Sequence, residues 1–292
     1  MMREYVIMTD SCCDLPAQLA EELGIVVQPM TLFLGEESFR NHLDGRELGF
    51  HEFYELLRGG AMPTTSSISV GEFEDLFRSA LQEGKDVLYL CFSSGMSTTY
   101  QSACIAAESL KEEFPEGKVL CVDSLAASLG QGMLVYLCAQ QKKAGKTLEE
   151  VHAYAMATRL HVSHWFTVDD LNHLKRGGRV SAATALVGTM LAIKPVLHVD
   201  NEGHLIAMSK VRGRAASLQA LAKRMKETMT EDPAKATVFI SHGDCEEEAK
   251  QTAAYVEEMT GAKVKLFNLI GAVIGSHSGP GTMALFFMGN ER

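Results

Sequence analysis

The chain has 292 residues, enough for one large domain or two of ordinary size. Hydrophobic residues make up 46% of it, which is typical of a globular protein, and the formal net charge is −10 at pH 7. An acidic chain lacks the basic face that a nucleic-acid phosphate backbone requires, so we expect no nucleic-acid partner. No stretch reaches the roughly 18 uncharged apolar residues of a membrane span, so no integral membrane segment is expected.

The N-terminus and the cysteines both predict a cytoplasmic protein. The apolar stretch before Asp10 is too short for a signal peptide and reads as a first strand. The seven cysteines are odd in number and include no CxxC pair. Free thiols in a reducing compartment are therefore expected, and no metal site.

The first half of the chain alternates strand-like and helix-like segments. This alternation predicts a mostly parallel sheet covered by helices, with strands buried on both faces. Strands are expected at residues 4–10, 86–92 and 118–124, and an extended, β-rich segment at 25–35. Helices are expected at 15–24, 49–60, 70–84, 97–114, 132–145 and 147–160.

The pattern changes near residue 160, where we place a domain boundary. Strand candidates then dominate, and residues 197–209 read as a hairpin around Asn201-Glu202-Gly203. The two predicted domains are residues 1–160 and 161–292. Strands of the second domain are expected at residues 161–168, 193–200, 203–211, 236–243, 263–269 and 282–289.

Small polar residues follow the strands of the first half. They lie at residues 9–11, 93–94 and 123–124, and a hydroxyl-rich loop occupies residues 63–69. Ligands of parallel α/β sheets bind at the carboxyl ends of the strands, so these side chains are expected at one edge of the sheet. The alternative is that they cap helices and form turns.

Several common chemistries are absent from the sequence. It contains no GxxxxGK[ST] phosphate loop, no GxGxxG after the first strand and no HExxH. The segment from Gly95 to Thr99 fails the GxSxG nucleophile elbow at its last position. The sequence therefore indicates a site that binds rather than a familiar catalytic centre.

Two residues stand out as ligands for an acid group. His277 lies between two serines and just before Gly-Pro-Gly at 279–281, with apolar runs on both sides. Ser97 is expected at the start of a helix, where backbone N–H groups and the helix dipole favour an anion. Hydroxyls and a histidine can hydrogen-bond a carboxylate or phosphate without attacking it.

Nine motifs, in order along the chain, resemble those of the DegV family of bacterial fatty-acid-binding proteins. The resemblance implies a three-layer α/β/α domain with a parallel sheet, followed by a two-layer α/β domain with a mixed sheet. It also implies a long-chain fatty acid in a tunnel between them, and no other cofactor. The motifs lie at residues 9–16, 63–69, 93–103, 122–132, 167–181, 191–205, 211–217, 239–244 and 270–281.

The resemblance implies that Thr65, Ser97 and His277 bind the fatty-acid carboxylate, with His277 carried by a turn at 275–281. It implies no catalytic residue. Ser67-Ile68 replaces the family's Gln-Pro, and Thr98 replaces the glycine after Ser97, so the head-group geometry is expected to differ. Supporting contacts are expected from Ser66, Ser94, Thr98 and Ser278.

Better-studied family members present the fatty acid to a separate ATP-dependent kinase, which forms acyl phosphate for phospholipid synthesis. The missing phosphate loop fits a carrier that leaves ATP to this partner. The candidate contacts with the kinase are Arg176, Arg179, Arg212 and Arg214, and the alternative is that they are solvated charges in ordinary turns.

Two other functions stay open at this point. One is a hydrolase or transferase that uses Ser97 with His277. The other is a binding protein for a different amphiphile, such as a retinoid, a sterol or an acyl phosphate.

Overall fold

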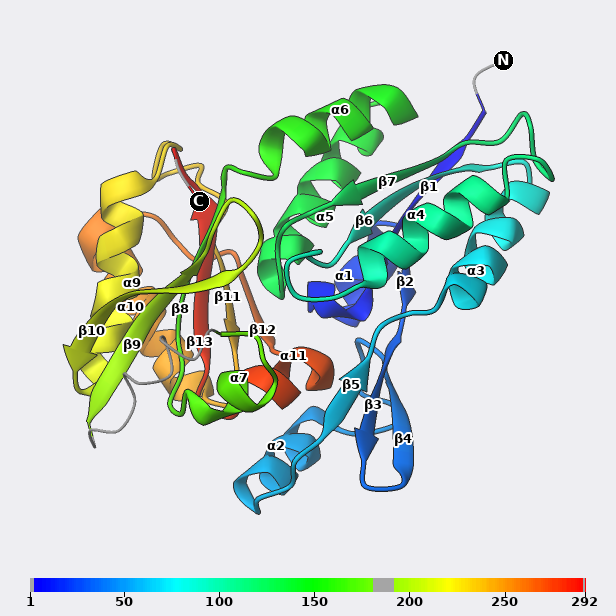
Figure 1. Cartoon of the computed structure of the whole chain (residues 1–292). Helices are drawn as coiled ribbons and strands as arrows, with labels where there is room; N and C mark the ends of the chain where they lie inside the picture. The colour runs from blue at the N-terminus through cyan, green and yellow to red at the C-terminus, as the bar shows by residue number, and fades with distance from the viewer. Residues whose placement is uncertain (1–2, 181–191, 291) are drawn as a thin grey trace.

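The structure is a computed structural model that describes residues 3–180, 192–290 and 292 (Figure 1). Two of the nine motifs have one residue outside this range: Ser181, the last residue of the motif at 167–181, and Leu191, the first residue of the motif at 191–205. Two sheet-containing halves lie side by side, and a smaller third sheet lies at the foot of the view. Among the described residues, no helix is both long enough and apolar enough to cross a bilayer.

The first half contains the expected parallel sheet, with strand order β2-β1-β6-β7. Helices α3 and α6 each begin with a capping box, formed by Ser69 with Glu72 and by Thr147 with Glu150. The strands are β1 (Tyr5–Asp10), β2 (Ile25–Gln28), β6 (Asp86–Cys91) and β7 (Val119–Asp123); the helices are η1 (Ser11–Cys13), α1 (Ala17–Glu22), α3 (Val70–Gln82), α4 (Thr99–Ser109), α5 (Leu129–Lys143) and α6 (Leu148–Thr158).

The second half contains a mixed sheet of order β10-β9-β8-β13-β11-β12, in which β11 and β12 are parallel and the other pairs are antiparallel. The predicted hairpin is confirmed as β9-β10. The strands are β8 (Val162–Thr167), β9 (Ile193–Val199), β10 (Leu205–Arg212), β11 (Phe239–His242), β12 (Leu266–Leu269) and β13 (Met283–Met288); the helices are α7 (Asn172–Arg176), α9 (Arg214–Thr228), α10 (Glu246–Thr260) and α11 (Ala272–Ser278).

Helix α5 connects the two sheets. It contacts β1 and β6 of the parallel sheet and β8, β11 and β13 of the mixed sheet. Its buried residues are spread around most of its circumference, as expected of a helix enclosed by protein. One hydrophobic cluster accordingly runs from Leu88 through Leu134 to Phe286. Helices α9 and α10 cover the other face of the mixed sheet (Figure 1), over a second cluster that includes Trp165 and Leu221.

A third, antiparallel sheet of order β4-β3-β5 was not expected from the sequence. The extended, β-rich segment expected over residues 25–35 forms two strands, because Pro29 lacks the N–H that would continue the pairing. Strand β2 therefore ends in the parallel sheet and β3 begins a new one. The strands of the new sheet are β3 (Met30–Leu34), β4 (Glu37–Asn41) and β5 (Thr64–Ser66), and the expected helix at 49–60 is α2 (Phe50–Arg58).

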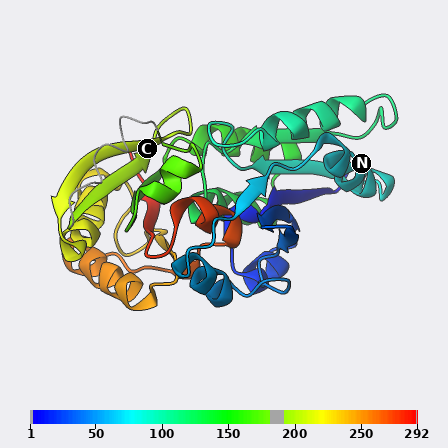
Figure 2. The ribbon, with the colours of Figure 1, turned by 60° about the horizontal axis from the view of Figure 1, so that its bottom comes forward.

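The small sheet and α2 pack against α11 of the second half. Leu32, Phe53 and Tyr54 form one buried cluster with Ala272. Figure 2 shows α11 near the middle of the molecule, between this small sheet and α7. All strands of the parallel sheet precede residue 160 and all strands of the mixed sheet follow it, but residues 30–66 pack across that point. The division of the chain at residue 160 stays a prediction.

We predict that Gly275→Ala loosens the packing of α11 on α2. A Cβ at Gly275 would lie 2.8 Å from both Cε1 of Phe53 and the hydroxyl of Tyr54. Tyr54 is fully buried and donates to the Ile270 carbonyl at 2.9 Å, so it has little room to move. We expect a loss of about 1–3 kcal/mol of unfolding free energy, measured by urea denaturation.

Gly71→Ala is the matched control for this substitution. Gly71 also lies in a helix, but its added Cβ would meet nothing within 4 Å. Alanine is the better helix former, so Gly71→Ala is expected to leave stability unchanged or raise it by up to ~1 kcal/mol. Equal effects of the two substitutions would contradict the packing argument.

Candidate functional site

A cavity of about 590 Å³ lies between the two halves of the chain. Most of its wall is apolar and comes from β8 and β13, from α11 and from the segments that follow β5 and β6. A cavity with this lining suits an apolar ligand that makes a few polar contacts. Apolar lining residues include Met96, Trp165, Phe166, Leu205, Ile274 and Phe286.

All seven residues expected at the carboxylate line this cavity. They come from β5, from the segment between β6 and α4, and from α11. The hydroxyl of Thr65 lies 2.8 Å from Nε2 of His277, within hydrogen-bond distance across the two halves. The seven are Thr65, Ser66, Ser94, Ser97, Thr98, His277 and Ser278.

Ser97 lies immediately before the N-cap of α4, as expected. Its hydroxyl accepts the Thr99 backbone N–H at 3.3 Å and lies 2.8 Å from the Thr99 hydroxyl. Thr98, the N-cap residue, makes no side-chain hydrogen bond to its own helix. It donates instead to the Ser67 hydroxyl at 3.1 Å. Two of the residues that depart from the family pattern therefore contact each other and join the loop after β5 to the start of α4.

A turn at 275–281 was expected to carry His277. The structure instead places His277 in the last turn of helix α11. The Gly-Pro-Gly segment follows the helix, and both of its glycines have positive φ. Gly271 allows the start of α11 to lie against Asp14 and Asn41, where a Cβ would come within 2.7 Å of the Asp14 carboxylate. Gly177 also permits close approach, since a Cβ there would lie 2.3 Å from Nδ1 of His277.

Arg179 lies in the cavity wall beside His277. It was expected to contact a partner, but its half-buried side chain points inward, where it donates to the Met96 carbonyl at 3.3 Å and to the Gly177 carbonyl. Burial first, and then the positive charge of Arg179, lower the pKa of His277 to about 4. The site therefore combines a neutral imidazole at physiological pH with a fixed positive charge, an arrangement that attracts an anion.

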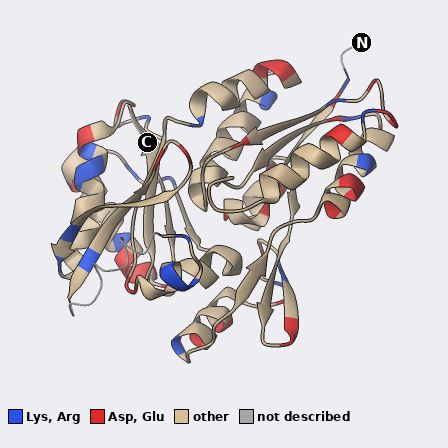
Figure 3. Cartoon of the chain, in the orientation of Figure 1, with Lys and Arg blue, Asp and Glu red and all other residues tan. Residues whose placement is uncertain are grey.

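A smaller cleft of about 320 Å³ adjoins the cavity and shares Thr65, Arg179 and His277 with it. Arg176 lines this cleft, is exposed, and lies 3.0 Å from Nδ1 of His173 through its Nη2. Figure 3 shows α7, with its basic residues, at the lower end of the second half, beside α11. Arg212 is exposed on β10 and does not line the cavity or the cleft.

Arg214 is not an exposed contact for a partner. Its side chain is mostly buried and forms two ion pairs, one with Glu248 at 2.6 Å and one with Asp169 at 3.8 Å. It also donates to the Gly281 carbonyl. These contacts hold the start of α9 against α10 and against the glycine turn after α11, because the two carboxylates offset the charge of the buried guanidinium.

The polar residues at the strand ends cluster at one edge of the parallel sheet, as predicted, because β1, β6 and β7 are adjacent and parallel. Most of them serve the fold instead of the cavity. The Asp10 carboxylate accepts the Phe92 and Cys12 N–H groups, and the Asp123 carboxylate accepts the Ser94 N–H. Of the residues at these strand ends, Ser94 lines the cavity. Buried carboxylates that take this many backbone donors have little capacity left for a ligand.

His164 and Ser128 also line the cavity and were not singled out from the sequence. His164 lies within an apolar strand and Ser128 beside a run of small residues, patterns that are shared by ordinary core positions. The ring of His164 bonds through Nδ1 to the Val162 carbonyl at 2.8 Å. Burial keeps the pKa of His164 well below its usual range, so this ring is neutral.

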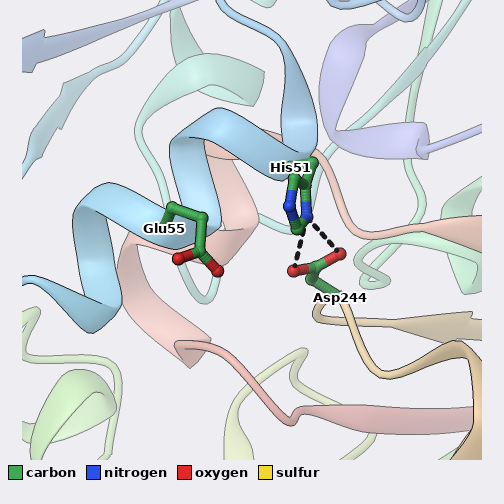
Figure 4. A group of neighbouring side chains, drawn as sticks. All are labelled: His51, Glu55 and Asp244. Atoms are coloured by element: carbon green, nitrogen blue, oxygen red, sulfur yellow. Dashed lines mark hydrogen bonds and ion pairs between the residues drawn. The ribbon is translucent and has the colours of Figure 1, made fainter.

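Within the described part of the chain, the side chains offer one possible cation site, formed by His51, Glu55 and Asp244 (Figure 4). The guanidinium of Arg58 already pairs with the two carboxylates of this cluster. Its Nη1 lies 2.7 Å from Glu55 and 2.5 Å from Asp244, while His51 lies 3.1 Å from Asp244. The cluster thus acts as an ion-pair network that joins α2 to the segment after β11, and a metal ion there would face a resident guanidinium.

We predict that Arg179→Gln raises the pKa of His277. Removing the guanidinium removes an unfavourable positive neighbour of the imidazolium, so the pKa should move up from about 4 while staying below the ordinary 6.5, because burial persists. The measurement is an NMR titration of the His277 ring. Arg176→Gln is the control, since that side chain is exposed; an equal shift in both variants would contradict the assignment to Arg179.

Three comparisons identify proteins to which this chain is similar. The family model described as an uncharacterised protein of the DegV family matches residues 4–290. A DegV domain-containing protein of Clostridium perfringens is 40% identical over 291 residues, which is 100% of this chain and 99% of the relative.

Solved structures agree over the whole chain. A DegV family protein from Thermus thermophilus, described by its fatty acid binding, has a TM-score of 0.87 at 34% identity and covers 98% of this chain and 99% of its own. DegV of Bacillus subtilis, described as a fatty acid binding protein, has a TM-score of 0.83 at 28% identity, with 99% and 100% covered. The α/β fold, with a parallel and a mixed sheet, is the DegV fold, and the chain belongs to the DegV family.

Proposed function

We propose that this chain binds one long-chain fatty acid in the cavity, with the carboxylate at Thr65, Ser97 and His277. One observation carries the proposal: three polar residues from three distant segments line the same apolar cavity. Two of them, Thr65 and His277, lie within hydrogen-bond distance of each other. Relatives from Thermus thermophilus and Bacillus subtilis that are described as fatty acid binding support it.

The acyl chain supplies most of the affinity in this arrangement. A sixteen-carbon chain has about 15 methylene and methyl groups to bury, each worth roughly 0.8 kcal/mol, for an upper bound of about 12 kcal/mol. Binding costs several kcal/mol of this in lost freedom and chain ordering. Each hydrogen bond to the carboxylate adds about 1–3 kcal/mol. The polar residues therefore position the head group more than they retain the ligand.

Arg179 supplies the positive charge at the head group. It lies in the wall of both the cavity and the adjoining cleft, close enough to His277 to lower the pKa of that ring. A half-buried guanidinium attracts a carboxylate more strongly than a solvated one, because water screens it less. In this proposal Arg179 favours the ionised fatty acid, while Thr65, Ser97 and His277 fix its orientation.

The same proposal makes the protein a carrier for a separate ATP-dependent fatty acid kinase. The sequence has no phosphate loop, and the cleft beside Thr65 and His277 would let a partner reach the carboxylate from outside. Arg176 lines that cleft. In this role the chain is a cytoplasmic binding subunit with domains at 1–160 and 161–292, and it does not itself catalyse the phosphoryl transfer.

We expect Ser97→Ala and His277→Ala proteins to keep their fatty acid but to support much slower acyl phosphate formation. The chain still binds the apolar wall, whereas a head group misplaced by about 1 Å can lose on the order of a hundredfold in rate. The measurements are lipid occupancy by mass spectrometry and the phosphorylation rate with the kinase at saturating carrier.

Two outcomes would contradict this division of roles. Empty variants would make the carboxylate the main anchor. Turnover of an activated acyl ester by the unmodified protein, lost in Ser97→Ala, would favour a hydrolase. The geometry argues against that chemistry, because the Ser97 hydroxyl is paired with Thr99 and the His277 ring with Thr65.

Charge reversal at Arg176 should weaken coupling to the kinase without emptying the cavity. Arg176→Glu places a negative charge beside the route to the carboxylate, so we expect a rise in the kinase's apparent KM for the carrier of roughly tenfold, the size of one interfacial contact. Arg212→Glu tests whether the interface extends to β10. Lys85→Glu, in the turn between α3 and β6, is the control. Loss of lipid from Arg176→Glu would show that the residue is structural instead.

A further inference from the structure

Asp14 is a buried carboxyl at the junction of the two halves. It follows η1, is 2% exposed and has a left-handed backbone, with φ of 49°. Its Oδ1 accepts the Gly271 backbone N–H at 2.9 Å, and its own carbonyl accepts the Asn268 side chain at 2.7 Å. A residue of the first half thus holds the segment that begins α11, the helix that carries His277.

The second carboxylate oxygen reaches the cavity wall. Oδ2 of Asp14 lies 2.5 Å from the Ser128 hydroxyl, and that hydroxyl lies 2.8 Å from the Ser241 hydroxyl on β11. Ser128 lines the cavity and has φ of 53°, a conformation that non-glycine residues adopt only when their surroundings hold them. The surrounding contacts thus connect the Asp14 carboxyl to α5, to β11 and to α11.

We infer that Asp14 is the positioning residue for α11 and therefore for His277, and that its protonation state decides how firmly the two halves hold that helix. The inference rests on the proposed function in one respect: that function makes the fatty-acid carboxylate the ligand of His277. The contacts of Asp14 stand independently of any ligand.

The surroundings of Asp14 favour its neutral form. Burial, and to a smaller extent the nearby Asp10 carboxylate, raise the pKa of this carboxyl to about 7, against the lowering effect of the hydrogen bonds from Ser128 and Gly271. The other titratable groups that face it from neighbouring elements are Cys12, Cys13, Tyr54 and His42, and the imidazole of His42 is paired with Glu47 at 3.2 Å.

The two forms of Asp14 make different hydrogen bonds. The ionised carboxylate accepts from Ser128. The protonated carboxyl donates to the Ser128 oxygen, which frees the Ser128 hydrogen for Ser241 and extends the chain of hydrogen bonds into β11. The protonated form therefore satisfies all three groups without a buried charge, whereas the ionised form holds an unneutralised charge in the interior.

The sign of the pH effect follows from the raised pKa. When α11 is held against the first half, which we call the closed arrangement, Asp14 binds its proton more tightly. In an open arrangement Asp14 reaches water and regains an ordinary pKa of 3.8. The hold on α11 is therefore complete at pH values below that ordinary pKa and is lost as the pH rises through about 7. Each pH unit in that window changes the closing equilibrium by up to about tenfold.

Hydrogen exchange of the α11 amides in the ligand-free protein tests the inference. The Gly271 amide reports directly, since it is the group that donates to Asp14. Protection factors, which are corrected for the intrinsic pH dependence of exchange, should fall about tenfold for residues 271–278 between pH 6 and pH 8. In Asp14→Asn, which is neutral and keeps an acceptor for Gly271, the factors should not change with pH.

Asp10→Asn is the matched control. Asp10 is equally buried and lies at the same strand end, but its carboxylate bonds Cys12, Tyr89 and Phe92 instead of α11. This variant should keep the fall in protection, with its midpoint at lower pH because the Asp10 charge no longer raises the pKa of Asp14. If Asp10→Asn abolishes the fall and Asp14→Asn keeps it, the inference is wrong.

Ser128→Ala decides the question if Asp14→Asn does not fold. It leaves the Asp14 carboxyl in place but removes a hydrogen bond that favours the ionised form, so the midpoint of the fall should move to higher pH. An unchanged midpoint overturns the inference.

A second readout is the release rate of a bound fluorescent long-chain fatty acid. This rate should rise with pH more steeply in the unmodified protein than in Asp14→Asn, and equal slopes would also overturn the inference. A chain that binds no fatty acid would defeat the proposed function and leave the exchange experiment intact.

Discussion

The docking of α11 against the first half of the chain is the interaction on which the site depends. Thr65 and His277 are 212 positions apart, and they meet because the small β4-β3-β5 sheet packs on the same helix that carries His277. The start of α11 is fixed by side chains from the other half, with Asp14 accepting from Gly271 and Asn41 accepting from Ala272. A shift of this helix would separate the imidazole from the hydroxyl.

The polar groups of the molecule fall into two sets with different tasks. One set, at the ends of β1, β6 and β7, is buried and satisfied by backbone N–H groups, and it holds the loops that follow these strands. The other set lines the cavity, where its side chains pair with one another, as Thr65 does with His277 and Ser97 with Thr99. The distinction is physical: a carboxylate surrounded by backbone donors is already solvated by the protein, whereas a hydroxyl at a cavity wall is not.

Few of the described residues around the cavity carry a charge. Arg179 is the cation in the wall among the described residues, and the two histidines that share the wall with it, His164 and His277, have pKa values well below the ordinary range because of burial. The carboxyl of Asp14, which bonds Ser128 of the wall, is driven toward its neutral form by the same cause. An apolar site with one fixed positive charge suits an amphiphile with a single anionic end.

The sequence by itself determined a large part of this picture. Apolar runs and helical periodicity located most strands and helices, because those patterns reflect local burial. The ordered motifs identified the family, and with it Thr65, Ser97 and His277, all of which line the cavity. Whether these residues hold a carboxylate stays a proposal.

Tertiary structure alone decided the rest. Pro29 marks a break in a strand, but the sequence does not say that the chain then leaves one sheet for another. Arg176, Arg179 and Arg214 are similar glycine-flanked arginines in the sequence, yet they lie respectively at the surface, in the cavity wall and in a buried ion pair. The reason is that a side chain's environment depends on elements distant in the chain: Arg214 is buried because Glu248 and Asp169 are there to neutralise it, and Arg179 faces the cavity because the backbone carbonyls of Met96 and Gly177 receive its N–H groups.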